Sequence, residues 1–206
     1  MIAPDSPGGR SAAHRSLGRF HGRCPGGAAG LDSSEQMFES AVLGVDPGLA
    51  RCGLAVVERR DRANSLVWSS TAVTAADAEE ADRLRILADA TRAAIEQHRP
   101  DAVAIERIAW SRNQVSALHV ARATGVVMLV AAQAGLLVQE YAPNEVKQAV
   151  TGMGNADKQQ VQLALSRIHG LREVPKQSDA ADAVAVALTH LLAAPLRAVA
   201  ARAGAR

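Results

Sequence analysis

The chain has 206 residues, a size that suits one ordinary domain whose core is large enough to need no disulfide framework. Hydrophobic residues make up 48% and charged residues 21%, which excludes a disordered or fibrous protein, and the 2% aromatic content leaves Ala, Val and Leu to fill the core. The formal net charge is only +2, and the basic excess of residues 107–176 is small enough for a solvated face, so charge alone does not indicate a polyanionic partner.

The cysteines and the first residues of the chain indicate the cellular compartment of the protein. Cys24 and Cys52 are too few for a disulfide framework or a zinc site, which favours a reducing compartment. Arginines interrupt the first residues, which excludes a secretory signal peptide but leaves an Arg-rich transit peptide open. Unbroken apolar runs such as residues 125–132 are well short of the ~20 residues of a membrane span. We therefore expect a soluble, cytoplasmic protein with no membrane contact.

Residues 1–36 are rich in Gly, Pro, Ser and Arg and show neither the period of a helix nor that of a strand. We expect them to be a disordered extension that is dispensable for activity, with Met37 as the physiological start. A globular domain is predicted over residues 37–195. Residues 196–206 are expected to form a flexible basic tail.

Three strands, a helix and a further strand are predicted at the start of the domain. Residues 41–45 (AVLGV) form a short apolar run that is typical of a strand buried on both faces. Residues 52–57 and 65–73 follow as two more strands of an antiparallel meander. Apolar positions at helical spacing predict an amphipathic helix over residues 77–98, and residues 102–105 return as a buried strand.

The second half of the domain continues the alternation of helices and strands. The pattern predicts, in order, a helix over 115–134, a strand over 136–141, a short helix that begins at Pro143, and helices over 157–168 and 179–192. Elements in this order place helices over a mixed sheet, so the fold class is α/β. The 115–134 helix is apolar on several faces, which makes it the best candidate for a subunit interface.

Four carboxylates lie where the predicted elements end or begin. Asp46 and Glu106 follow two buried strands, at the carboxyl ends where open α/β sheets bind their ligands. Asp179 and Asp182 stand three residues apart at the start of the last helix and share one of its faces. Singly, each acid has an ordinary explanation, as a turn residue before Pro-Gly or as a partner of a helix dipole. If the helix end lies over the strand ends, all four converge.

Such a cluster of acids requires cations, because unpaired carboxylates at short range repel one another. Carboxylate oxygens are the ligands that Mg²⁺ prefers, so one or two Mg²⁺ ions are expected, for which Mn²⁺ would substitute. Two ions about 3.5–4 Å apart activate a water and stabilise the leaving oxygen in an attack on a phosphodiester. The pattern therefore favours nuclease or polymerase chemistry.

Four segments together resemble the RuvC-type Holliday junction resolvases. They are VLGVDPGLARCGLAVVE, AIERIAWSRN, YAPNEVKQAVTGMGNADKQQV and SDAADAVAVALTH, spread over residues 41–192. The resemblance implies a ribonuclease H-like mixed sheet flanked by helices, a homodimer, and Mg²⁺-dependent symmetric nicking of two like strands at a four-way DNA junction in recombination and repair. It also implies cooperation with the RuvA–RuvB branch-migration complex.

By motif position, the resemblance assigns catalysis and metal binding to the four acids named above, and it maps two family lysines onto Lys147 and Lys158. A lysine beside the scissile phosphate neutralises charge in the transition state, so Lys158 is expected to be catalytic and to touch DNA. Lys147 is expected to bind a DNA phosphate. Without the motif, both would be interpreted as solvated helix lysines.

One position departs from the family pattern. Members often place an aromatic residue three positions after the motif Glu, where it stacks on an unpaired base, and here Ala109 stands at that position with Trp110 beside it. Either Trp110 has taken over the stacking, or the junction opens without it, or Trp110 packs beneath its own loop. The neighbouring Arg112 and Asn113 are also expected to contact DNA.

Three other functions stay open at this point. A YqgF-type nuclease shares the first motif but lacks the final DAADA helix and the K-Q…D-K-Q-Q segment. A sugar-kinase-like ATPase would use Gly48 and Gly53 to cradle phosphate, but such enzymes usually have Thr or Ser where this chain has Leu49. A junction-binding protein without catalysis would not need all four acids, and a nicking assay on a synthetic junction separates it from an enzyme.

Overall fold

The computed structural model describes residues 40–61, 63–107 and 114–204. The expectations for residues 1–36, and those for Trp110, Arg112 and Asn113, lie outside the described residues. In chain order the elements are β1 (Ala41–Asp46), β2 (Arg51–Arg60), β3 (Ala63–Val73), α1 (Glu80–His98), β4 (Ala102–Glu106), α2 (Gln114–Gln133), β5 (Leu137–Tyr141), α3 (Pro143–Thr151), α4 (Lys158–Arg167) and α5 (Ser178–Gly204).

Each predicted strand and helix is present within a few residues of its expected place, with one clear difference at the C-terminal end. The sequence pattern ended the last helix at residue 192, but α5 continues to Gly204. A proline inside a helix removes one backbone hydrogen bond and usually ends or kinks the helix, yet the helical backbone of α5 passes through Pro195. Residues 196–204, predicted to be a flexible tail, are therefore helical.

The sheet places β1 and β4 side by side and parallel. Its strand order is β3-β2-β1-β4-β5, with antiparallel β1–β2 and β2–β3 pairs and parallel β1–β4 and β4–β5 pairs. Val45 is the partner of Ile105 in the parallel pair. Because parallel strands run in the same direction, Asp46 and Glu106 follow at the same end of the sheet.

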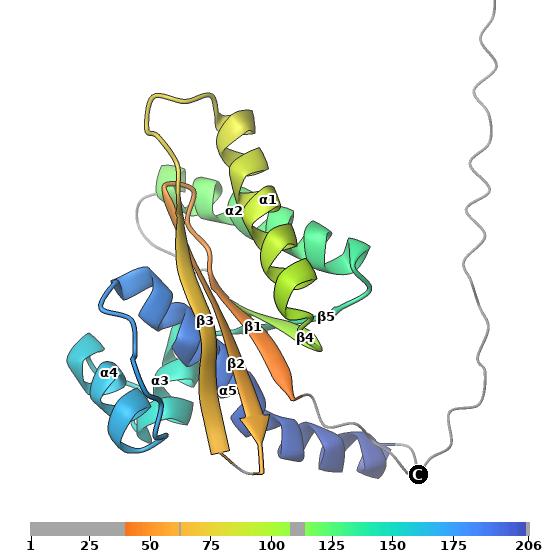
Figure 1. The fold of residues 1–206 in the computed structure, drawn as a ribbon, viewed down its shortest axis with the longest axis vertical. Coiled ribbons are helices and arrows are strands. Elements are labelled where there is room, and N and C mark those ends of the chain that lie inside the picture. The colour runs from red at the N-terminus through yellow and green to blue at the C-terminus, as the bar shows by residue number, and fades with distance from the viewer. Residues whose placement is uncertain (1–39, 62, 108–113, 205–206) are drawn as a thin grey trace, which may run out of the picture. The chain divides into compact units, whose positions relative to one another are not determined.

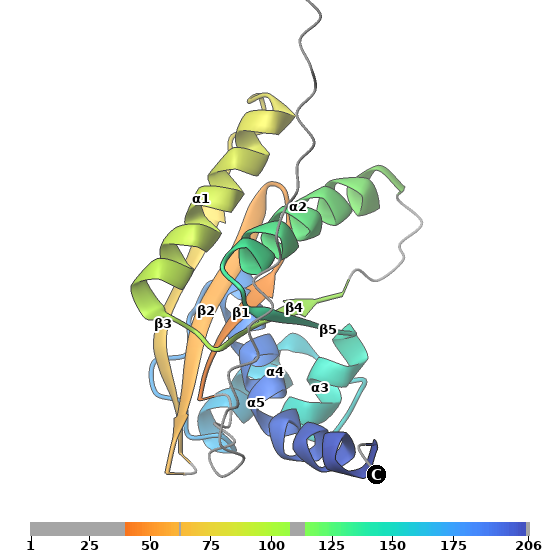
Figure 2. The ribbon, with the colours of Figure 1, turned by 90° about the vertical axis from the view of Figure 1, so that its right-hand side faces the viewer.

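Helices cover both faces of this sheet, as Figures 1 and 2 show. On one face, α1 and α2 pack over a core that includes Leu43 of β1, whereas α3, α4 and α5 pack over the other face with Val42 of β1. Successive strand side chains point to opposite faces, so both must be apolar when both faces are covered. This explains the unbroken apolar run of β1. The fold is the predicted α/β class, a mixed sheet flanked by helices.

The α2 helix has one covered and one uncovered face. Its segment Val115–Gln133 is long and apolar enough to cross a membrane by length and composition, with a mean hydropathy of 1.7, although the unbroken apolar runs are short. Only 28% of this stretch is buried. Ala123 and Val127 are buried on the inner face, while Leu118 and Leu129 are half exposed or more. The predicted interface helix therefore does present an apolar outer surface.

The α5 helix lies unusually close to β1 and β2, at two glycines. A Cβ atom placed on Gly44 would collide with the carbonyl oxygen of Ala183, and one placed on Gly53 would collide with the carbonyl oxygen of Asp179. Both collisions are with backbone atoms, which cannot move out of the way as a flexible side chain can. The two glycines therefore allow the first turns of α5 to lie directly over the strand that ends in Asp46.

This packing predicts that Gly44→Ala destabilises the protein. The added methyl must push α5 away from the sheet, and overpacking of this kind costs about 1–3 kcal/mol. Denaturant unfolding of the full chain measures the loss. Gly154→Ala is the matched control, because a Cβ there would meet its nearest neighbour, the Asn144 carbonyl oxygen, at an ordinary 3.5 Å. Equal stability of the two variants would contradict the close approach of α5.

Candidate active site

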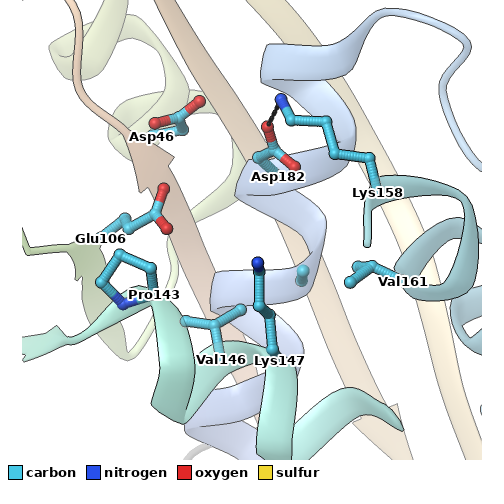
Figure 3. Close-up of a pocket in the computed structure, with 9 residues that line it drawn as sticks. Asp46, Glu106, Pro143, Val146, Lys147, Lys158, Val161 and Asp182 are labelled. Atoms are coloured by element: carbon cyan, nitrogen blue, oxygen red, sulfur yellow. Dashed lines mark hydrogen bonds and ion pairs between the residues drawn. The ribbon is translucent and has the colours of Figure 1, made fainter. Parts of the chain in front are cut away.

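Three of the four predicted acids and both predicted lysines line one pocket. It has a volume of about 280 Å³ and lies at the carboxyl ends of β1 and β4, where α3, α4 and α5 meet the sheet. Its lining consists of Asp46, Glu106, Pro143, Val146, Lys147, Lys158, Val161, Asp182 and Ala185. Figure 3 shows the Asp46 and Glu106 carboxylates on one side of the pocket and Asp182 on the other, with the two lysines directed toward the acids.

Asp46 and Glu106 are the last residues of β1 and β4, and both side chains are partly buried. Burial raises the pKa of Asp46 to about 8, and the negative charges of Glu106 and Asp182 add to the rise. Burial also raises the pKa of Glu106, as does the charge of Asp182. The sheet and helix α5 thus hold carboxylates together in a place where their ionised forms are disfavoured.

Asp182 is bound to Lys158, which is the first residue of α4. The Lys158 Nζ donates to Asp182 Oδ2 at 3.0 Å and to the Ser178 Oγ at 2.7 Å, and the Ser178 hydroxyl in turn lies 3.4 Å from Asp182 Oδ2. The hydrogen bond to Asp182 raises the pKa of Lys158, so this lysine remains charged. The sequence pattern indicated no role in the site for Ser178, although its position four residues before Asp182 places it on the same helix face.

The start of α4 is fixed by its own sequence. Asp157 caps the helix by accepting a hydrogen bond from the Gln160 backbone at 2.8 Å, and the Gln160 side chain accepts one from the Asp157 backbone at the same distance. This reciprocal capping box holds the first turn of the helix. Lys158 follows immediately, so the cap orients the residue whose ammonium group reaches Asp182.

The fourth predicted acid, Asp179, is not among the residues that line the pocket. Its Oδ2 accepts a hydrogen bond of 2.6 Å from the Nε of Arg51, the first residue of β2. The i, i+3 spacing correctly put Asp179 near Asp182, but nothing in the sequence pattern indicated that Arg51 would contact it. The structure therefore brings three acids to the pocket and leaves the fourth beside it.

The donor chemistry of the pocket fits a hard divalent cation. Within the residues that the structure describes, no three His, Cys, Asp or Glu side chains are placed closely enough to hold an ion as they stand. The side chains of Asp46, Glu106 and Asp182 nevertheless offer only carboxylate oxygens, the ligands of Mg²⁺ and similar ions. Burial raises the pKa of Asp46 most, and the charges of Glu106 and Asp182 raise it further. A bound cation would offset both effects.

Similarity to known proteins agrees with this site. Residues 42–190 match the family model of the crossover junction endodeoxyribonuclease RuvC. The chain belongs to the RuvC family. It is 49% identical over 156 residues to the RuvC of Frankia alni, covering 75% of this chain and 79% of that protein. It is 45% identical over 160 residues to the RuvC of a Roseiflexus species, covering 78% of this chain and 95% of that protein.

Solved structures give the same result. Thermus thermophilus RuvC in complex with a Holliday junction substrate matches with a TM-score of 0.72 and 34% identity, covering 77% of this chain and 96% of that one. The yeast mitochondrial Holliday junction resolvase matches with a TM-score of 0.57 and 12% identity over 77% of this chain, which shows the fold alone. The fold is therefore the predicted ribonuclease H-like one, and members of the RuvC family are metal-dependent endodeoxyribonucleases.

Membership of the RuvC family rejects two of the alternative functions. The family match covers both segments that a YqgF-type nuclease lacks, the final helix and the segment around Lys147 and Lys158. The sugar-kinase-like alternative needed Gly53 to cradle a phosphate, but the space beside Gly53 is filled by the backbone of Asp179. Gly53 serves helix packing instead.

The raised pKa of Asp46 makes the stability of the metal-free protein depend on pH. Because the folded pKa is about 8 and the ordinary value is 3.8, the contribution of this group to stability is present below pH 3.8 and is lost as the pH rises to about 8. Asp46→Asn removes the ionisable group. In a chelating buffer, we expect the variant to melt above the wild type at about pH 8, by ~2–4 °C for each kcal/mol of relieved burial cost and repulsion.

The same melting curves provide the control for this prediction. The difference between Asp46→Asn and wild type should shrink at about pH 5, where most of the wild-type Asp46 carries its proton. Asp77→Asn, at an exposed position, should follow the wild type at both pH values. An Asp46→Asn variant that melts below the wild type at the higher pH would contradict the assigned burial and repulsion of the Asp46 carboxylate.

Proposed function

We propose that this chain resolves Holliday junctions by metal-dependent, symmetric nicking of two like strands during recombination and repair, with Mg²⁺ as the metal. The observation that carries the proposal is the single pocket in which Asp46, Glu106 and Asp182 meet Lys147 and Lys158, in a chain of the RuvC family. A four-way DNA junction is supported as the substrate by the Thermus thermophilus relative, which was solved with a Holliday junction.

In this proposal, Asp46, Glu106 and Asp182 hold the divalent ions. When bound, the ions activate the attacking water and stabilise the leaving oxygen of the phosphodiester. The apolar side chains of Pro143, Val146 and other lining residues form part of the pocket wall, and the carboxylates of Asp46 and Glu106 are partly buried there. Electrostatic interactions are stronger in such a partly desolvated site than in water.

The two lysines act on the DNA. Lys158 donates hydrogen bonds to Asp182 and Ser178, so its ammonium group lies at the edge of the pocket, where it would neutralise charge that develops on the scissile phosphate. Lys147 projects from α3 into the same pocket and would bind a phosphate of the strand. In this proposal, the ammonium group of Lys158 acts in catalysis and that of Lys147 binds DNA.

Symmetric nicking of two strands needs two identical sites, and we propose a homodimer formed through the outer face of α2. Val115, Leu118 and Leu129 are 64%, 50% and 58% exposed on this helix, and an exposed apolar stripe is typical of a subunit interface. By family resemblance, we further propose that the dimer works with the RuvA–RuvB branch-migration complex in the cytoplasm.

The proposed role of Asp182 predicts that Asp182→Asn abolishes cleavage but preserves DNA binding. A lost carboxylate weakens the metal site that stabilises the transition state, so the nicking rate should fall by roughly 100-fold or more. Affinity should be unchanged or slightly higher, because phosphate contacts from Lys and Arg dominate it. Nicking of a synthetic four-way junction in Mg²⁺, together with a gel-shift titration, measures both.

Asp77→Asn serves as the control in the nicking assay, because it removes an exposed carboxylate that is not among the residues lining the pocket. It should nick at the wild-type rate. Nicking by Asp182→Asn at near the wild-type rate would remove this residue from the metal site. Absence of nicking by the wild type itself would reject the enzyme and leave a junction-binding protein.

The phosphate contact of Lys147 predicts a change in the salt dependence of binding. Each lost phosphate contact lowers the slope of log K against log salt by roughly one unit, so Lys147→Ala should show that reduction. Arg85→Ala is the control, since Arg85 lies on α1, on the opposite side of the sheet from the pocket, and it should leave the slope unchanged. An unaltered slope for Lys147→Ala would show that this lysine does not touch phosphate.

A further inference from the structure

The ion pair between Arg51 and Asp179 separates two acids that share a helix face. Asp182 lines the pocket, whereas Asp179, three residues earlier on α5, is bound to Arg51 at 2.6 Å and is not among the residues that line the pocket. Of the three acids that raise the pKa of Asp46, Asp179 has the smallest effect. Asp179 is therefore close to the pocket, but its carboxylate is bound to Arg51.

The backbone that carries Arg51 is held firmly in place. The Thr74 amide donates to the Ala50 carbonyl at 3.0 Å, and the Thr74 hydroxyl donates to the Leu49 carbonyl at 2.6 Å. Thr74 is 6% exposed and accepts a further hydrogen bond of 2.9 Å from the Nε of Arg83. The turn that leads from Asp46 to Arg51 is thus fixed by a buried side chain, and it presents Arg51 in one direction.

The helix side of the pair is equally constrained. Gly53 lies two residues after Arg51, so the two residues share one face of β2. The backbone carbonyl of Asp179 packs against Gly53 closely enough to exclude a Cβ atom there. Because strand and helix are in direct contact at this point, the Asp179 carboxylate lies within reach of Arg51.

We propose that Arg51 is a positioning residue that holds Asp179 outside the pocket in the DNA-free enzyme and thereby weakens the binding of divalent cations. This inference rests on the proposed function, in which Asp46, Glu106 and Asp182 form the cation site. An oxygen engaged by a guanidinium is not free for a metal, and the positive charge of Arg51 also repels an arriving cation.

The ion pair between Arg51 and Asp179 can also open. The Arg51 side chain is 49% exposed and that of Asp179 is 25% exposed, and ion pairs in contact with water are weak. A phosphodiester is an alternative anion for the guanidinium, and a divalent ion is an alternative cation for the carboxylate. Arrival of DNA and metal together would therefore separate the two partners, whereas metal alone competes against Arg51.

The test is the Mn²⁺ affinity of the full chain without DNA, measured by titration calorimetry. Arg51→Gln should bind Mn²⁺ roughly twofold to fivefold more tightly than the wild type, the range expected for the loss of an exposed ion pair. Arg51→Lys, which keeps the charge, should stay nearer to the wild type. Arg60→Gln is the matched control, because Arg60 is a 79% exposed arginine at the other end of β2 that pairs with Glu58, and its affinity should be unchanged.

A second pair of variants isolates Asp179. In the Arg51→Gln background, Asp179→Asn should remove the part of the gain that comes from the freed carboxylate and leave only the part that comes from the lost positive charge. In the wild-type background, Asp179→Asn should weaken Mn²⁺ binding far less than Asp182→Asn does. A merely structural role of Arg51 would weaken metal binding when the residue is removed, so unchanged or weaker affinity in Arg51→Gln overturns the proposal.

These measurements also separate this proposal from the proposed function. If Asp182→Asn loses Mn²⁺ affinity while Arg51→Gln does not gain it, the cation site stands and the role of Arg51 is rejected. If the wild type binds no Mn²⁺, or if Asp182→Asn binds it equally well, both proposals fail.

Discussion

The contact between the backbone of α5 and the strands β1 and β2 decides the geometry of the whole site. Gly44 and Gly53 have no side chain to separate the helix from the sheet, so the carbonyl groups of Ala183 and Asp179 come into direct contact with them. That approach places Asp182 opposite Asp46. In the sequence, Gly44 and Gly53 look like ordinary strand glycines. In the structure, they determine where α5 lies and so where its acids are placed.

The second requirement is parallel pairing of β1 and β4, which brings Asp46 and Glu106 to the same end of the sheet. Buried strands, covered on both faces, leave these side chains little access to water, and burial is the main cause of their raised pKa values. The fold thus maintains a cluster of acids whose ionised forms are disfavoured. Lys147 and Lys158 offset part of this charge, since both lower the pKa of Glu106.

Much of this arrangement could be predicted from sequence, because it depends on local patterns. The apolar runs of β1 and β4 indicated buried strands, their terminal acids indicated the ligand-binding end, and the spacing of Asp179 and Asp182 indicated one helix face. The partner of Asp179 could not be predicted, because Arg51 lies far away in the chain and reaches it only after helix and sheet have packed. The helical continuation of α5 beyond Pro195 was also missed, because a proline inside a helix normally ends it.

In the proposed divalent-cation site, Asp46, Glu106 and Asp182 supply the carboxylates and Lys158 lies beside them. Anomalous diffraction from crystals of the full chain soaked in Mn²⁺ tests this arrangement most directly, since the metal position is then seen without reference to activity. An anomalous peak is expected in the pocket, within the coordination distance of ~2.0–2.6 Å from carboxylate oxygens of these three residues. A Mn²⁺ ion bound elsewhere on the protein, with no peak among these carboxylates, would contradict it.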